Sequence, residues 1–97
     1  MSNKICDNFH KFYEEKRIWE RQNWLGVPFY KLPMDALVMQ ELICKIKPRY
    51  IIETGTCFGG SALFYASIMQ LLGYGQVITI DKVEKKIDIS QTAQFLF

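Results

Sequence analysis

Hydrophobic positions at helical spacing mark the start of the chain. Within residues 3–22, the side chains of Ile5, Phe9, Phe12 and Trp19 fall near one face of a helix, and charged residues occupy the other side. This pattern predicts an amphipathic helix that runs through most of residues 3–22.

A second expected helix follows an irregular segment. Gly26 and Pro28 interrupt the helical pattern, so we expect residues 24–32 to form an aromatic-rich loop. Apolar side chains then recur every fourth position across residues 33–47, and Pro48 ends the pattern. These positions are Met34, Val38, Leu42 and Ile46.

The period then changes from helix to strand. Residues 50–52 are aromatic and β-branched, which predicts a strand buried on both faces. Residues 53–60 hold three glycines within six positions and predict a tight loop. Ser61 is a suitable N-cap for a helix over residues 62–72, which is apolar on nearly every side and must be covered.

A second strand, residues 76–81, completes a strand–loop–helix–strand unit over residues 50–81. The right-handed crossover rule makes its two strands parallel. We therefore expect an α/β fold: the first βαβ unit of a doubly wound, Rossmann-like sheet, preceded by two helices. The chain is expected to be one partial domain (1–97), with a helical extension and loop in residues 1–32 and the start of the Rossmann-like domain in residues 33–97.

Composition excludes several classes of protein. The 97 residues carry a net charge of +2, which does not predict a nucleic-acid partner, and the longest apolar stretch, residues 62–66, is too short for a membrane span. The three cysteines, Cys6, Cys44 and Cys57, have no metal-binding spacing, so we expect reduced thiols, no metal site and a cytoplasmic protein.

The glycine loop predicts a ligand site. A glycine loop between a strand and a helix is where open parallel sheets bind nucleotide-like ligands, because the backbone approaches closely and the helix start offers free N–H groups. The spacing G-x-x-x-G-G differs from the dinucleotide fingerprint, and no Lys-Ser/Thr pair follows it as in a P-loop.

Two acids suggest which ligand. Glu53, at the end of the first strand, would repel a pyrophosphate and attract an ammonium or sulfonium group, and S-adenosylmethionine carries both. Asp81, at the end of the second strand, is placed to accept hydrogen bonds from ribose hydroxyls. A dehydrogenase-type nucleotide site is disfavoured by Glu53 and by the glycine spacing.

Three segments carry a family resemblance: Trp-x-Gly-Val-Pro at residues 24–28, Lys-x-Pro-x-Asp at residues 31–35, and Ile-Ile-Glu-Thr-Gly-Thr-x-x-Gly-Gly-Ser-Ala at residues 51–62. Together they are similar to the cephalosporin hydroxylase family, a branch of S-adenosylmethionine-dependent O-methyltransferases that includes rhamnosyl O-methyltransferase-like proteins. The resemblance implies a class I methyltransferase fold. It also implies cofactor contacts at Glu53, Gly55, Thr56, Gly59, Gly60, Ser61 and Asp81.

The resemblance further implies methyl transfer to a hydroxyl of a small molecule or sugar. In such proteins the acidic metal ligands and the catalytic base lie on later strands, so we expect an amino-terminal piece that is inactive alone, with any divalent metal held by residues absent from it. No catalytic residue is assigned. The alternative is a non-enzymatic remnant or interaction module that needs a partner or self-associates as a homo-oligomer.

Some other side chains are of types that often carry function, and for most of them we expect a structural role or a surface position instead. Cys57 has no nearby histidine in sequence and is not expected to be a nucleophile, and His10 is expected at the surface. Lys31 and Asp35 belong to the segments that carry the resemblance, which implies that they lie on a loop that closes over the cofactor. Aromatic residues near the first loop are expected in core or lid packing rather than at a substrate mouth: Trp19, Trp24, Phe29 and Tyr30.

Overall fold

The computed structural model describes residues 3–82, and the expectations for residues 83–97 lie outside that range. In chain order its elements are α1 (Lys4–Glu15), the 3₁₀ helix η1 (Ile18–Arg21), β1 (Asn23–Trp24), β2 (Val27–Pro28), α2 (Pro33–Ile46), β3 (Tyr50–Thr54), α3 (Gly60–Leu72) and β4 (Gln76–Ile80). Across this described range, every helix is too short or too polar to cross a membrane.

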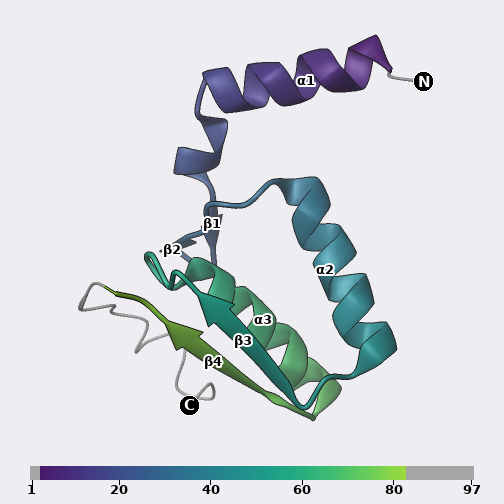
Figure 1. Cartoon of the computed structure of the whole chain (residues 1–97), viewed down its shortest axis with the longest axis vertical. Coiled ribbons are helices and arrows are strands. Elements are labelled where there is room, and N and C mark those ends of the chain that lie inside the picture. Colours follow the sequence, from purple (N-terminus) through teal and green to yellow (C-terminus); the bar gives the residue numbers. More distant parts are fainter. Residues whose placement is uncertain (1–2, 83–97) are drawn as a thin grey trace.

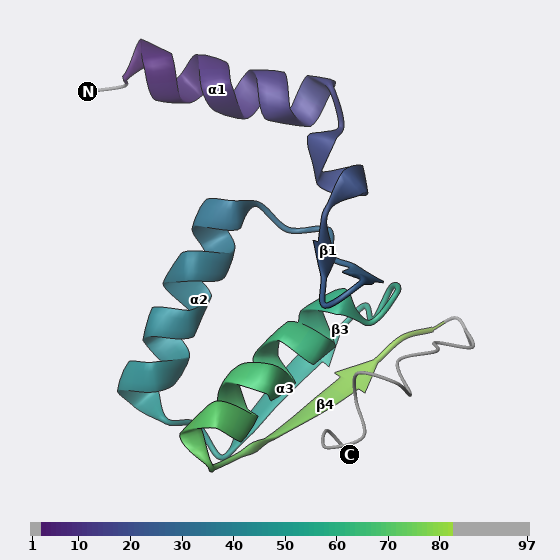
Figure 2. The same cartoon turned by 180° about the vertical axis from the view of Figure 1, so that it is seen from behind.

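The expected βαβ unit is present. Strands β3 and β4 pair in parallel with Glu53 opposite Thr79, and α3 connects them and covers one face of the pair (Figures 1 and 2). Strand β3 extends two residues beyond the expected 50–52, so Glu53 lies within the strand rather than in the loop. The α/β prediction is confirmed for this part of the chain.

Helix α3 forms the centre of the core, as its apolar sequence predicted. Leu63 is fully buried, and Phe64, Ala66 and Met69 are also buried against neighbouring elements. Ile43 of helix α2 belongs to the same hydrophobic cluster as Phe64, Ala66 and Met69, while many other apolar side chains of α2 are exposed. Burial of each large side chain of this kind stabilises the fold by roughly 1.5–3 kcal/mol.

The expectation that β3 is buried on both faces is wrong for the described chain. Ile51 and Glu53 point to the side covered by α3, whereas Ile52, on the opposite side, is 67% exposed. Ile78 and Ile80 of β4 are exposed on that same side. Neighbouring strand residues point to opposite faces, and within residues 3–82 only one face has a helix over it.

The long first helix expected over residues 3–22 is also interrupted. Helix α1 ends at Glu15, and Arg17 takes a left-handed backbone conformation (φ 50°) before η1 begins. The guanidinium of Arg17 pairs with Glu20 and lies 5.1 Å from the centre of the Trp19 ring, which favours this turn over a continued helix. Figure 1 shows α1 as an arm that projects away from the βαβ unit.

The expected loop over residues 24–32 contains a short antiparallel hairpin, β1–β2, that packs on α3. The indole N–H of Trp24 donates to Ser67 Oγ over 3.1 Å, and the Trp24 ring meets the Phe64 ring edge-on at 4.8 Å. A Cβ on Gly60 would lie 2.0 Å from the carbonyl oxygen of Pro28, so only glycine allows this contact. The hairpin therefore brings the residues that follow it to the start of α3.

Candidate functional site

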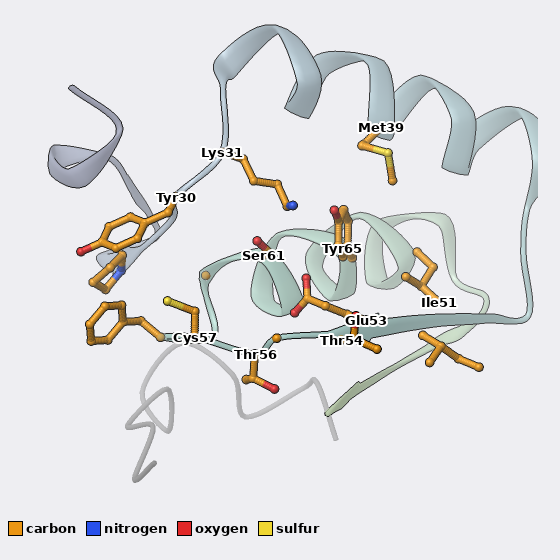
Figure 3. Close-up of a pocket in the computed structure, with 15 residues that line it drawn as sticks. Tyr30, Lys31, Met39, Ile51, Glu53, Thr54, Thr56, Cys57, Ser61 and Tyr65 are labelled. Atoms are coloured by element: carbon orange, nitrogen blue, oxygen red, sulfur yellow. The ribbon is translucent and has the colours of Figure 1, made fainter. Parts of the chain in front are cut away.

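A cavity of about 430 Å³ lies at the carboxyl end of β3 (Figure 3). Its walls come from β3, the glycine loop, the start of α3, one side chain of α2 and the segment after β2. The lining residues are Pro28, Tyr30, Lys31, Met39, Ile51, Ile52, Glu53, Thr54, Gly55, Thr56, Cys57, Phe58, Gly60, Ser61 and Tyr65. Small-molecule sites typically enclose roughly 300–1,000 Å³, so the cavity is large enough for one.

The glycine loop is fastened to the end of β4 by three successive hydrogen bonds. The N–H of Gly55 donates to the carbonyl of Ile80 over 2.7 Å, and the hydroxyls of Thr56 and Thr79 lie 2.7 Å apart. The N–H of Cys57 donates to Asp81 Oδ2 over 3.0 Å. This loop therefore has a fixed shape even though Gly55 and Cys57 both adopt positive φ angles, of 86° and 53°.

Glu53 is the carboxylate inside the cavity. It is half-buried, and the Thr79 hydroxyl donates to its Oε1 over 3.0 Å. Since the single proton of Thr79 is used in this bond, Thr56 must be the donor in the Thr56–Thr79 contact while Glu53 is ionised. The result is a chain of two hydrogen bonds that links the glycine loop, through Thr79 of β4, to the carboxylate of Glu53.

The environment of Glu53 disfavours its charge. Burial raises the pKa of Glu53, and this is only partly opposed by the Thr79 hydrogen bond and the positive charge of Lys31. Burial also raises the pKa of Tyr65, whose ring lines the same cavity, and the negative charge of Glu53 adds to that effect. A cationic group in the cavity would relieve the unfavourable electrostatics of Glu53.

Lys31 enters the cavity from the opposite wall. The side-chain amide of Gln22 donates to the carbonyls of both Phe29 and Lys31, and the Phe29 N–H donates to Gln22 O over 2.9 Å. These bonds fix the backbone of the segment after β2. Figure 3 shows the Lys31 amine directed over the cavity towards the side of Glu53, Ser61 and Tyr65.

The residues predicted as cofactor contacts divide into two groups. Five of them line the cavity together: Glu53, Gly55, Thr56, Gly60 and Ser61. Gly59 is buried and serves as the N-cap of α3 at a φ of 88°, and Asp81 holds the glycine loop instead of lining the cavity. Their contacts with a cofactor stay predictions.

The expected cap at Ser61 is wrong. Helix α3 begins at Gly60, so Ser61 is its second residue, and the N-cap is Gly59 without a side-chain hydrogen bond. With Gly59 as the N-cap, in the left-handed conformation that glycine adopts readily, the helix begins two residues earlier than the sequence predicted. The Ser61 hydroxyl is consequently not occupied in capping.

Sequence reasoning did not find Thr79 and Tyr65 as parts of the site. The alternation of β4 and its parallel register with β3 place Thr79 beside Glu53, a relation that becomes visible only once the register is known. Tyr65 lies one helical turn after Ser61, and this spacing indicates that both side chains lie on the same face of α3.

A second hollow, of about 380 Å³, adjoins the segment after β2. It is lined by His10, Glu14, Trp19, Tyr30, Lys31 and Leu32. The expectation of core packing is confirmed for Trp24 and Phe29, which join the α3 cluster. Trp19 and Tyr30 instead face this hollow, with ring centres 5.2 Å apart.

The residues present do not fit a metal ion. Nowhere within residues 3–82 do three or more His, Cys, Asp or Glu side chains come together as a ligand set. The thiols of Cys6, Cys44 and Cys57 are all free. No chemical step is therefore assigned to a metal in this part of the chain.

A parallel βαβ unit with a glycine loop and an acid near the end of each strand is an arrangement typical of α/β domains that bind nucleosides. The chain belongs to the family described as rhamnosyl O-methyltransferase/CmcI, whose model matches residues 16–95. This match confirms the resemblance seen in the sequence.

Curated relatives and a solved structure agree with this assignment. Rhamnosyl O-methyltransferases of Mycobacterium tuberculosis (strain H37Rv) and Mycobacterium leprae are 32% and 33% identical over 88 residues, or 90% of this chain. The chain spans 36% and 38% of their lengths. A solved structure of CmcI with SAH superposes with a TM-score of 0.70 at 26% identity, covering 78% of this chain and 40% of that one.

Proposed function

We propose that the cavity binds S-adenosylmethionine and that the chain is the cofactor-binding portion of a methyltransferase acting on a hydroxyl of a small molecule or sugar. The family and the mycobacterial relatives, named as rhamnosyl O-methyltransferases, support the reaction class. The solved CmcI structure, which carries SAH, supports the cofactor class. The observation that carries the proposal is the half-buried carboxylate of Glu53 in a cavity next to a glycine loop.

The chemistry of the cavity fits this cofactor. S-adenosylmethionine carries an ammonium and a sulfonium, and a carboxylate whose charge is disfavoured by burial gains from either cation. The glycine backbone at Gly55 leaves space for close approach of a ligand, since nothing lies within 4 Å of the position that a Cβ would take there. The bound cofactor would supply an electrophilic methyl group; the protein's part is to hold it in a fixed orientation.

The ribose-binding role of Asp81 stays part of this proposal. Asp81 follows β4 directly, and its Oδ2 already accepts the Cys57 N–H. A carboxylate accepts several hydrogen bonds, so contact with a ribose hydroxyl is compatible with this bond. Asp81 would then fix the loop and the sugar at once.

Titration calorimetry of the full chain with S-adenosylhomocysteine tests the proposal. Binding is expected for the native chain, and the Glu53→Gln variant should bind about tenfold more weakly because a charge-assisted contact to the ammonium is lost. The Glu41→Gln variant, which changes an exposed carboxylate of α2, is the matched control. A chain that is folded by circular dichroism and binds no S-adenosylhomocysteine contradicts the proposal.

A second candidate function rests on a different observation. Within residues 3–82, the face of β3 and β4 opposite α3 exposes Tyr50, Ile52, Ile78 and Ile80. An apolar sheet face of this kind is suited to association, so the chain would act as an interaction module that forms a homo-oligomer. Sedimentation velocity of the native chain and the Ile52→Lys variant tests this: self-association that the variant abolishes supports it, and a monomeric native chain excludes it.

We place the protein in the cytoplasm, as the three unpaired thiols predicted. Fractionation of cells that produce the tagged chain tests this placement.

A further inference from the structure

We infer that Lys31 and Glu53 together form a clamp for the α-amino acid end of the cofactor, Lys31 binding the carboxylate and Glu53 the ammonium. This inference rests on the proposed function and adds to it the residue that recognises the carboxylate. It follows that this end of the cavity selects ligands with a free α-amino acid group that carries both charges.

The first support is the arrangement of opposite charges across one cavity. Glu53 lies on β3 and Lys31 on the segment after β2, and these two residues, 22 positions apart in the sequence, both line the cavity. Burial raises the pKa of Glu53, and the positive charge of Lys31, together with the Thr79 hydrogen bond, opposes that rise only in part. In Figure 3 both side chains are directed into the same space.

The second support is that Lys31 and Glu53 do not form an ion pair with each other in the described part of the chain. Within residues 3–82, the ion pairs shorter than 4.0 Å are Lys11–Glu15 and Arg17–Glu20, both in the amino-terminal arm. Lys31 is thus near Glu53 without contacting it. An α-amino acid carries its ammonium and carboxylate on one carbon, so it would fill this gap with each charge facing its opposite.

The third support is that the backbone of the segment that carries Lys31 is held by hydrogen bonds and ring packing. Gln22 donates to the carbonyls of Phe29 and Lys31, and the Tyr30 ring packs edge-on against Phe58 of the glycine loop, with centres 5.5 Å apart. The close contact of Pro28 with Gly60 fixes the start of the same segment. A lysine on a solvated, unbraced loop would have no such support.

Calorimetry with three ligands tests the clamp: S-adenosylhomocysteine, its decarboxylated analogue, which keeps the amine, and methylthioadenosine, which lacks the whole amino acid. Lys31→Met should weaken S-adenosylhomocysteine about tenfold or more and leave the other two within about twofold. Glu53→Gln should weaken both amine-bearing ligands and leave methylthioadenosine unchanged. Lys45→Met, an exposed lysine of α2, is the matched control.

The outcomes separate the clamp from the proposed function. If the native chain binds S-adenosylhomocysteine and Lys31→Met binds it equally well, the clamp is wrong and the proposed function stands. If Lys31→Met weakens all three ligands equally, Lys31 supports the cavity without recognising the carboxylate, and the clamp is again wrong. If the native chain binds none of the ligands, both are overturned. Lys31→Arg, which keeps the charge, should recover most of the affinity.

Discussion

The carboxylate of Asp81 accepts a hydrogen bond from the backbone N–H of Cys57 over 3.0 Å, so the end of β4 holds the loop that follows β3. Cys57 has a positive φ of 53°, a backbone conformation that residues other than glycine rarely adopt without support from neighbouring groups. The residue predicted to bind ribose thus also shapes the loop that lines the cavity.

Replacing Asp81 with alanine should destabilise the fold. The variant leaves the Cys57 N–H without its acceptor, and a hydrogen bond to a charged group contributes about 1.5–3 kcal/mol, reduced here towards about 1 kcal/mol by partial exposure. Urea denaturation measures the loss, and Asp7→Ala on the exposed α1 arm is the control. Equal stability of the Asp81 variant and the native chain would contradict a role in holding the loop.

Gly60→Ala should displace the hairpin from α3. Its Cβ would stand 2.0 Å from the Pro28 carbonyl oxygen, a backbone atom that cannot move alone. We expect a loss of at least about 1–3 kcal/mol in thermal or urea unfolding, as for overpacked cores. Ser61→Ala, one residue further along α3, is the matched control, and because Ser61 caps nothing it should change stability by less than about 0.5 kcal/mol.

The stability of the chain should depend on pH through Glu53. Burial raises the pKa of Glu53 above its ordinary value of 4.5, so its contribution to stability is fully present below that pH and is lost as the pH rises through the folded-state pKa. Glu53→Gln should therefore be more stable than the native chain at about pH 7, and this advantage should disappear at about pH 3.5. A variant that is less stable at about pH 7 would contradict the burial argument.

Ser67→Ala should cost the hairpin one of its anchors. The Ser67 hydroxyl accepts the Trp24 indole N–H over 3.1 Å and donates to the Phe64 carbonyl over 2.8 Å. Loss of the first bond removes a net contribution of about 0.5–1.5 kcal/mol, because the indole N–H is only partly buried and can still reach water. Urea denaturation followed by tryptophan fluorescence measures it; an unchanged midpoint would show that the ring contacts of Trp24 alone hold the hairpin.

The sequence predicted the βαβ unit because its signals are local. Alternation and β-branched residues mark β3 and β4, and the glycines mark the loop between β3 and α3. The break at Arg17 was not predictable from apolar spacing, since Ile5, Phe9, Phe12 and Trp19 suit a continuous helix. The left-handed turn there depends on contacts of Arg17 with its neighbours.

Local sequence patterns predicted one wall of the candidate site, and only the family resemblance pointed to Lys31 on the other. The glycine loop and Glu53 follow one another in sequence, so their proximity needed no tertiary information. Lys31 reaches the cavity only because the hairpin packs on α3, a contact that depends on the missing side chain of Gly60 and on the fit of Trp24 against Phe64. Such packing does not appear in a periodic pattern of apolar residues.

The alignment of Glu53 with Thr79 has a consequence for misfolding. Successive side chains of a strand alternate between faces, so a slip of β3 by one residue against β4 would carry Glu53 out of the cavity and bring Ile52 in. The same slip would turn Ile51 away from the core, so one isoleucine would replace the other there, and Glu53 would lose its hydrogen bond from Thr79. A mispaired chain would therefore keep its strands and its helix content, yet its cavity would lack the carboxylate of Glu53.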